Sequence, residues 1–158
     1  MNCPVPEPET TSWLEAARSP RVAGALEAVY AMISDQIEAR GPACWASGRC
    51  CNFREADHRL YTTGLEAAYS VTRLETPLSI EALDKAKSRG GCAFQVANIC
   101  GVHAIKPSGC RVYFCDKSAQ AWQNELSERA VEEIRRIHDR EGIEYRYAEW
   151  GSLLRMFV

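Results

Sequence analysis

Two cysteine-rich runs constrain this chain more than any other feature of its sequence. The first, from Cys44 to Cys51, reads CWASGRCC, and the second, from Cys92 to Cys115, reads CAFQVANICGVHAIKPSGCRVYFC. Together they hold seven of the eight cysteines. A reducing cytosol does not preserve disulfides, so thiols this concentrated in a chain of cytosolic type indicate metal binding. We therefore expect a metal or iron–sulphur site.

Composition limits the classes of protein to consider. At 158 residues, 46% apolar and 25% charged, the chain suits a single globular domain over 1–158. A net charge of -2 provides no global basic field, so we expect no nucleic acid as a partner. No apolar run approaches the roughly 20 residues that cross a bilayer, and the start lacks the features of a secretory signal. We expect a cytoplasmic protein without a membrane; if it were secreted, eight cysteines would allow four disulfides.

Helix-capping signals dominate the pattern along the chain. Residues 1–11, rich in proline, are predicted to be an extended arm, and a capping box at Ser12 and Glu15 predicts a helix after it. Further helices are predicted from Pro20 to Gly41, after a second capping box at 63–66, after Ser79, and over 116–141. Short strands are expected at 58–62 and 143–147, and a short apolar helix or tail at 150–157. The predicted fold is a small, mostly α single domain with one or two short β-strands and an irregular cysteine-rich metal-binding core at 40–120.

Apolar stripes on the two longest predicted helices identify core positions. The stripes have three- and four-residue spacing and comprise Val22, Leu26, Tyr30, Ile33 and Ile37 on one helix, and Trp122, Leu126, Ala130, Ile134 and Ile137 on the other. Glu132 and Arg136 lie four residues apart on the wet side of the second helix, where they are expected to pair.

The predicted metal ligands are seven cysteines: Cys44, Cys50, Cys51, Cys92, Cys100, Cys110 and Cys115. Cys3 lies in the arm, remote from both runs, and is expected to be a bystander. No C-x2-C pair of the usual zinc type occurs, but Cys100 and His103 form a C-x2-H pair that makes eight donors, enough for two zinc sites. An iron–sulphur cluster takes four cysteines at less regular spacing. Cysteine spacing alone does not distinguish zinc from an iron–sulphur cluster. We favour a 4Fe-4S cluster, with zinc as the alternative.

Basic residues accompany the cysteines and would offset the negative charge of bound thiolates. Five lie within a few residues of a cysteine: Arg49, Arg54, Lys106, Arg111 and Lys117. Most such charges are solvated. Arg111 is the expected exception, because it follows Cys110 directly and precedes the apolar run VYF.

The spacing resembles that of the YkgJ-type cysteine-cluster family, the zinc- or iron-chelating CxxCxxxCC domain. Its first motif is similar to Cys44-x5-Cys50-Cys51, and its C-x-F opening is similar to 92–94. Its second motif, C-x-I-x-x-x-R-P-x-x-C-R-x-Y, looks like 100–113, which read CGVHAIKPSGCRVY. The resemblance covers roughly residues 40–120, about half the chain.

Three positions depart from the family pattern. Ser47 stands where many members have a cysteine, Lys106 replaces the usual arginine, and Cys115 is an additional thiol. Either Cys115 or His103 would compensate for the ligand missing at position 47. The resemblance implies metal chelation, and a related flagellin lysine methylase carries such a motif with an iron–sulphur cluster.

The predicted function is metal binding through the cysteine cluster, with an unnamed protein or redox partner. The alternative is a metal-dependent enzyme for methyl transfer or redox chemistry that uses the cysteine centre. Because the chain contains no Gly-rich phosphate loop, H-E-x-x-H or G-x-S-x-G motif, an active site would have to be that centre itself.

Overall fold

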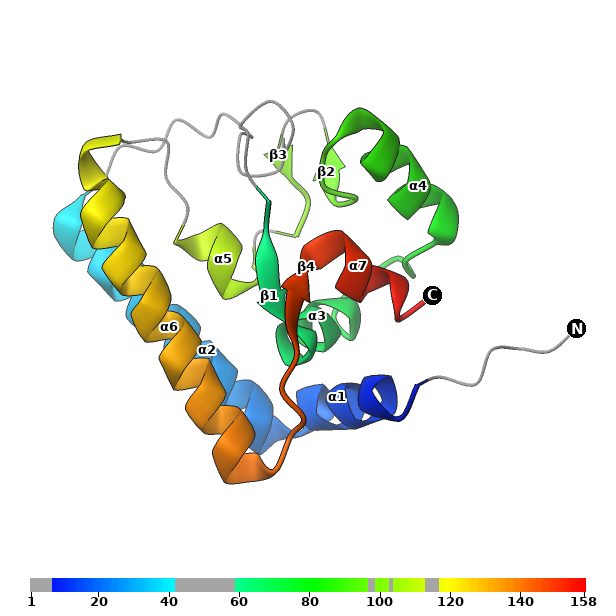
Figure 1. Cartoon of the computed structure of the whole chain (residues 1–158), viewed down its shortest axis with the longest axis horizontal. Helices are drawn as coiled ribbons and strands as arrows, with labels where there is room; N and C mark the ends of the chain where they lie inside the picture. Colours follow the sequence, from blue (N-terminus) through cyan, green and yellow to red (C-terminus); the bar gives the residue numbers. More distant parts are fainter. Residues whose placement is uncertain (1–6, 42–58, 97–98, 103, 113–116) are drawn as a thin grey trace, which may run out of the picture.

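Two long amphipathic helices form one side of the molecule. In the computed structural model, which describes residues 7–41, 59–96, 99–102, 104–112 and 117–158, these helices are α2 (Pro20–Arg40) and α6 (Gln120–Glu141), and they lie side by side (Figure 1). Most of each predicted stripe is buried, with Leu26, Ile33 and Ile134 almost fully enclosed, whereas Ile37 and Trp122 are half-buried. Each helix ends at a glycine with positive φ, Gly41 at 65° and Gly142 at 64°, as the sequence predicted.

The first helix differs from its prediction. α1 (Pro8–Arg18) begins at Pro8 after the N-cap Glu7, so residues 8–11 are helical and the predicted arm is too long. Ser12 lies inside the helix and does not cap it, because proline in the first turn already starts the helix without a side-chain cap. Residues 1–6 lie outside the described part. α1 packs across α3 (Gly64–Val71).

A small antiparallel sheet joins the middle of the chain to its end. β1 (Tyr61–Thr63) pairs with β4 (Tyr147–Glu149), with Thr62 opposite Ala148. β1 leads into α3 through the predicted capping box, in which Thr63 and Glu66 satisfy each other's backbone donors. β4 leads into α7 (Trp150–Arg155), whose first two N–H groups after Trp150 donate to the Glu149 carboxylate. The strand predicted at 143–147 was placed too early, because within that range only Tyr147 is paired and the strand continues to Glu149.

The remaining elements are short and carry the second cysteine run. α4 (Ile80–Arg89) starts at the predicted cap Ser79 and is followed by a hairpin of β2 (Gln95–Val96) and β3 (Ile99–Cys100). α5 (Ser108–Arg111) and the 3-10 turn η1 (Lys117–Ala119) then lead into α6. The long C-terminal helix therefore begins at Gln120 and not at 116, a residue outside the described part. The fold is mostly α, as predicted.

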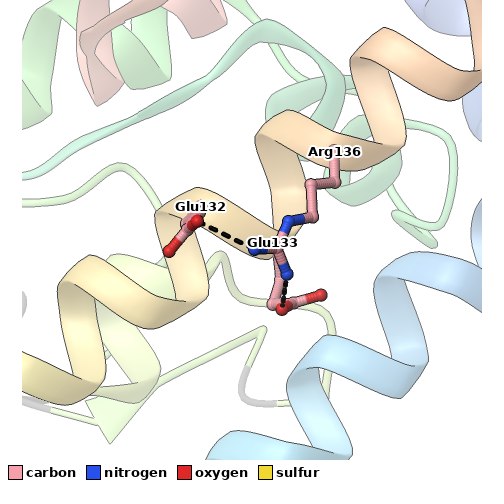
Figure 2. Close-up of polar contacts among 3 residues, drawn as sticks. All are labelled: Glu132, Glu133 and Arg136. Carbon is pink, nitrogen blue, oxygen red and sulfur yellow. Dashed lines mark hydrogen bonds and ion pairs between the residues drawn. The ribbon is translucent and has the colours of Figure 1, made fainter.

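Ion pairs lie on the exposed face of α6. Arg136 donates to Glu132 at 2.8 Å and to Glu133 at 2.6 Å, both from the same helix (Figure 2). The first pair confirms the predicted i, i+4 contact. All three side chains are more than 40% exposed, so the pairs stabilise the helix only slightly.

His138 is buried at the end of α6 and has a structural role. Its ring is 1% exposed, its Nδ1–H donates to the Ile143 carbonyl at 3.1 Å, and its Nε2 has no partner among the described residues. The Tyr145 ring meets it edge-on at 5.1 Å. Burial lowers the pKa of His138 below its usual 6.5, although the Ile143 carbonyl acts in the opposite direction.

We expect His138 to make stability depend on pH. Below pH 6.5 the unfolded chain binds a proton that the folded chain resists, so the free energy of unfolding is greatest above that pH and falls as the pH decreases. Urea unfolding at about pH 7.5 and about pH 5.5, on either side of the unfolded pKa, measures the difference. A His138→Asn variant keeps a donor toward Ile143 but does not titrate, and its stability should change less between the two pH values. Equal changes in both proteins would contradict the assignment.

Candidate metal centre

The structure describes three of the seven predicted ligands. Cys92 is buried, and Cys100 and Cys110 are half-buried. All three belong to the second cysteine run. The other four, Cys44, Cys50, Cys51 and Cys115, lie outside the described residues, as do His103 and the expected bystander Cys3.

Cys92 is placed by the end of α4. Gly90 takes a left-handed conformation with φ 70°, and the Gly91 N–H donates to the Ala86 carbonyl at 3.0 Å, which turns the chain inward. The thiol then joins the apolar core at 5% exposure. The Cys92 carbonyl accepts hydrogen bonds from the Arg89 guanidinium and from the Gln95 N–H. Two hydrogen bonds therefore fix the position of the Cys92 carbonyl.

Cys100 lies on the hairpin that follows. It stands opposite Gln95, and the Gly101 N–H donates to the Phe94 carbonyl at 2.8 Å. Facing residues of an antiparallel pair lie about 5 Å apart, so the hairpin brings the Cys100 backbone next to a segment only three residues past Cys92. Phe94 anchors the hairpin edge-on against Trp150, with ring centroids 6.0 Å apart. The pairing of β2 with β3 was not predicted, since each strand is only two residues long.

Cys110 lies in α5, which packs closely on β1. A Cβ at the neighbouring Gly109 would lie 2.5 Å from Leu60 Cδ1 and 3.1 Å from the Tyr61 carbonyl oxygen. A larger residue at this position would require the Leu60 side chain to move and the Tyr61 carbonyl to shift slightly. The Cys110 N–H donates to the Pro107 carbonyl at 3.1 Å, closing the first turn of the helix.

Arg111 folds back over the segment before α5. Its Nε donates to the Lys106 carbonyl at 2.8 Å and its Nη2 to the Ala104 carbonyl at 3.0 Å. The guanidinium also lies 4.0 Å from the centroid of the Tyr30 ring on α2. Two hydrogen bonds and a ring contact therefore fix the Arg111 guanidinium, and its predicted role beside a metal centre stays a prediction. This side chain places a fixed positive charge one residue from Cys110.

A buried carboxylate fastens α5 to the core. Glu66 is 1% exposed; its Oε1 accepts from the Ser108 N–H at 2.8 Å and from the Tyr30 hydroxyl at 3.1 Å. Its Oε2 accepts from the Thr62 hydroxyl at 2.7 Å and from Thr63. Burial raises the pKa of Tyr30 well above 10.0, and the nearby Glu66 charge adds to this effect while Arg111 opposes it.

Sequence reasoning found Glu66 only as half of a capping box. Its second role links α2, β1, α3 and α5 around one carboxylate. The available signal was its setting: the helix reads GLEAAYSV, whose apolar residues on both sides of Glu66 mark a buried helix and hence a buried acid. Such an acid needs hydrogen-bond donors from elsewhere in the fold.

No match to a family model, a curated protein or a solved structure is found for this chain. The resemblance to the YkgJ-type family stays a prediction. Among the described residues, no helix combines the length and the apolar character that crossing a bilayer requires.

The described residues alone do not assemble a metal site. Within 7–41, 59–96, 99–102, 104–112 and 117–158, no group of three or more Cys, His, Asp or Glu side chains is positioned to hold an ion. A centre that uses Cys92, Cys100 or Cys110 would therefore draw further ligands from the four predicted cysteines outside these ranges. The donor set suits such a centre, since thiolate sulphur is the usual ligand of zinc and of iron–sulphur clusters.

Proposed function

We propose that this chain is a cytoplasmic metal-binding protein whose cysteine cluster holds a 4Fe-4S cluster, with zinc as the second choice. The observation that carries the proposal is the concentration of seven of eight cysteines in two runs. The three described thiols support it because all are wholly or partly withdrawn from solvent. A cluster in this place would supply one-electron chemistry or a closed structural centre to an unnamed protein partner. We retain the prediction that nucleic acid and membranes are not partners.

The protein's own groups suit this role. Short hydrogen-bonded elements, the β2–β3 hairpin and α5, carry Cys100 and Cys110, so two of the ligands would be held before metal arrives. Arg111 would offset part of the thiolate charge beside Cys110, because two backbone carbonyls already orient its guanidinium. Glu66 keeps α5 in position through Ser108.

A metal-dependent enzyme for methyl transfer or redox chemistry is the alternative. One observation favours it: a cavity of about 790 Å³ has Cys92 in its wall. A cavity of this volume next to a ligand would give a substrate access to the centre. Binding of exogenous ligands to the metal would support catalysis, whereas a closed coordination shell would support a structural or electron-transfer role.

Serine variants of individual cysteines test the proposal. We expect Cys100→Ser and Cys110→Ser, purified without oxygen, to lose most of the iron and acid-labile sulphide, because a cluster needs about four thiolates. Cys3→Ser is the matched control and should retain them. Circular dichroism of each variant separates metal loss from unfolding of the helices. Wild-type metal content in both variants would contradict the assignment of these ligands.

A further inference from the structure

A cavity lies between α4 and α7, and its proposed role does not depend on the metal. Its volume is about 790 Å³, within the roughly 300–1,000 Å³ range of small-molecule sites. α4 and α7 contact each other near the C-terminus (Figure 1). The wall contains the apolar side chains of Leu83, Ala86, Trp150 and Leu154. This wall suits a flat or aliphatic organic body.

The charges around the cavity are unbalanced toward positive. Among the described residues that line it, three are cations, Arg59, Lys87 and Arg155, and one is a carboxylate, Glu149, in a chain whose net charge is -2. The Glu149 carboxylate is already engaged by the Gly151 and Ser152 N–H groups at 3.0 and 2.8 Å.

The three cations differ in their partners. Arg155 is paired with Asp84 at 2.6 Å. The side chains of Arg59 and Lys87 are exposed and form no ion pair within the described part of the chain. Among the described residues, these are the two cavity cations without an ion-pair partner.

Trp150, one of the wall residues, contains a buried polar group without a partner in the described part of the chain. Its ring is 2% exposed, and its indole N–H has no acceptor among the described residues. Buried donors are seldom left without a partner in folded proteins. A ligand acceptor that reached this N–H would satisfy it while the ring packed on the ligand's apolar part.

We propose that this cavity binds a small amphipathic organic anion, with its apolar body against Leu83, Leu154 and Trp150 and its acidic group near Arg59 and Lys87. The probe for the test is 8-anilinonaphthalene-1-sulfonate, and its uncharged parent N-phenyl-1-naphthylamine is the control ligand. Equilibrium dialysis against the full-length protein, as purified, measures the binding of each. We expect the sulfonate to bind one site per chain, more tightly than the uncharged parent.

Two variants locate the binding. The double variant Arg59→Gln/Lys87→Gln should raise the dissociation constant of the sulfonate about tenfold and leave that of the uncharged parent nearly unchanged. The matched double variant Arg129→Gln/Lys85→Gln removes exposed charges outside the cavity and should bind like wild type. Ala86→Trp should fill the cavity and abolish binding of both probes.

Two results would overturn the proposal. One is equal affinity of the double cavity variant and wild type for the sulfonate, which shows that the cations do not recognise it. The other is unchanged binding in a folded Ala86→Trp protein, which places the probe elsewhere. If Ala86→Trp fails to fold, as judged by circular dichroism, the comparison of the two double charge variants tests the proposal without it. Metal content is measured in every sample, so loss of the centre is recognised separately.

Discussion

Replacement of Glu66 by glutamine is expected to lower the free energy of unfolding by about 3–5 kcal/mol. Both carboxylate oxygens accept from donors, including the backbone N–H of Ser108 on one side and that of Thr63 on the other. A glutamine NH₂ group must face one of these two N–H groups, whichever way the amide turns. At least one buried backbone donor therefore loses its acceptor, and Tyr30 or Thr62 must find another.

Urea unfolding of Glu66→Gln beside Glu81→Gln measures this effect. Glu81 lies in the first turn of α4, as Glu66 lies in the first turn of α3, but it is exposed. The control should change stability by less than about 0.5 kcal/mol. Hydrogen exchange of the Ser108 amide gives a second readout, because this N–H should lose protection in Glu66→Gln. Similar stability losses in both variants would contradict the role given to the buried carboxylate.

Replacement of Trp13 by alanine is expected to cost about 3–5 kcal/mol, because it empties the contact between α1 and α3. The ring is fully buried and packs so closely on Gly64 that a Cβ there would lie 2.5 Å from it. Its Nε1–H also donates to the Glu144 carbonyl at 2.9 Å, which ties α1 to the segment before β4. The ion pair of Arg146 with Glu9, at 3.2 Å, joins the same two segments but is too solvent-exposed to compensate.

Trp122→Ala is the matched control for this prediction. Trp122 is only half-buried on α6, where the Arg40 guanidinium lies 5.2 Å from its ring centroid. Loss of this exposed cation–π contact and of part of the apolar surface should cost about 1 kcal/mol. Denaturant unfolding of the two variants provides the comparison, and equal losses would mean that α1 does not depend on Trp13.

Local signals predicted the helices well where a cap or a breaker was present. Ser79, Thr63 and the glycines at 41 and 142 set helix boundaries through interactions within a few residues, so sequence alone locates them. The start of α1 was predicted too late. The proline-rich residues before Ser12 were expected to be extended, but Pro8 begins the helix, and Ser12 lies inside it. The strands were placed less accurately, because pairing of β1 with β4 is decided by partners more than 80 residues apart in sequence.

The candidate site could be proposed from the sequence as a set of residues but not as an arrangement. Cysteine spacing identifies the thiols, yet it does not reveal that Cys92 ends in the core beside a cavity or that Cys100 lies on a hairpin. The role of Glu66 under α5 depends on Ser108, 42 residues away, and no local pattern indicates that contact. Arg111 was the exception, since its apolar neighbours in sequence already set it apart.

Anaerobic purification of the wild-type chain, followed by visible absorption and elemental analysis, tests the central claim most directly. We predict a brown protein with iron and acid-labile sulphide in equal amounts, about four of each per chain. A colourless protein with stoichiometric zinc would retain the metal-binding role and reverse the order of the two metals. A protein that folds with neither iron nor zinc, and with its cysteines unbound, would contradict the proposed metal-binding function.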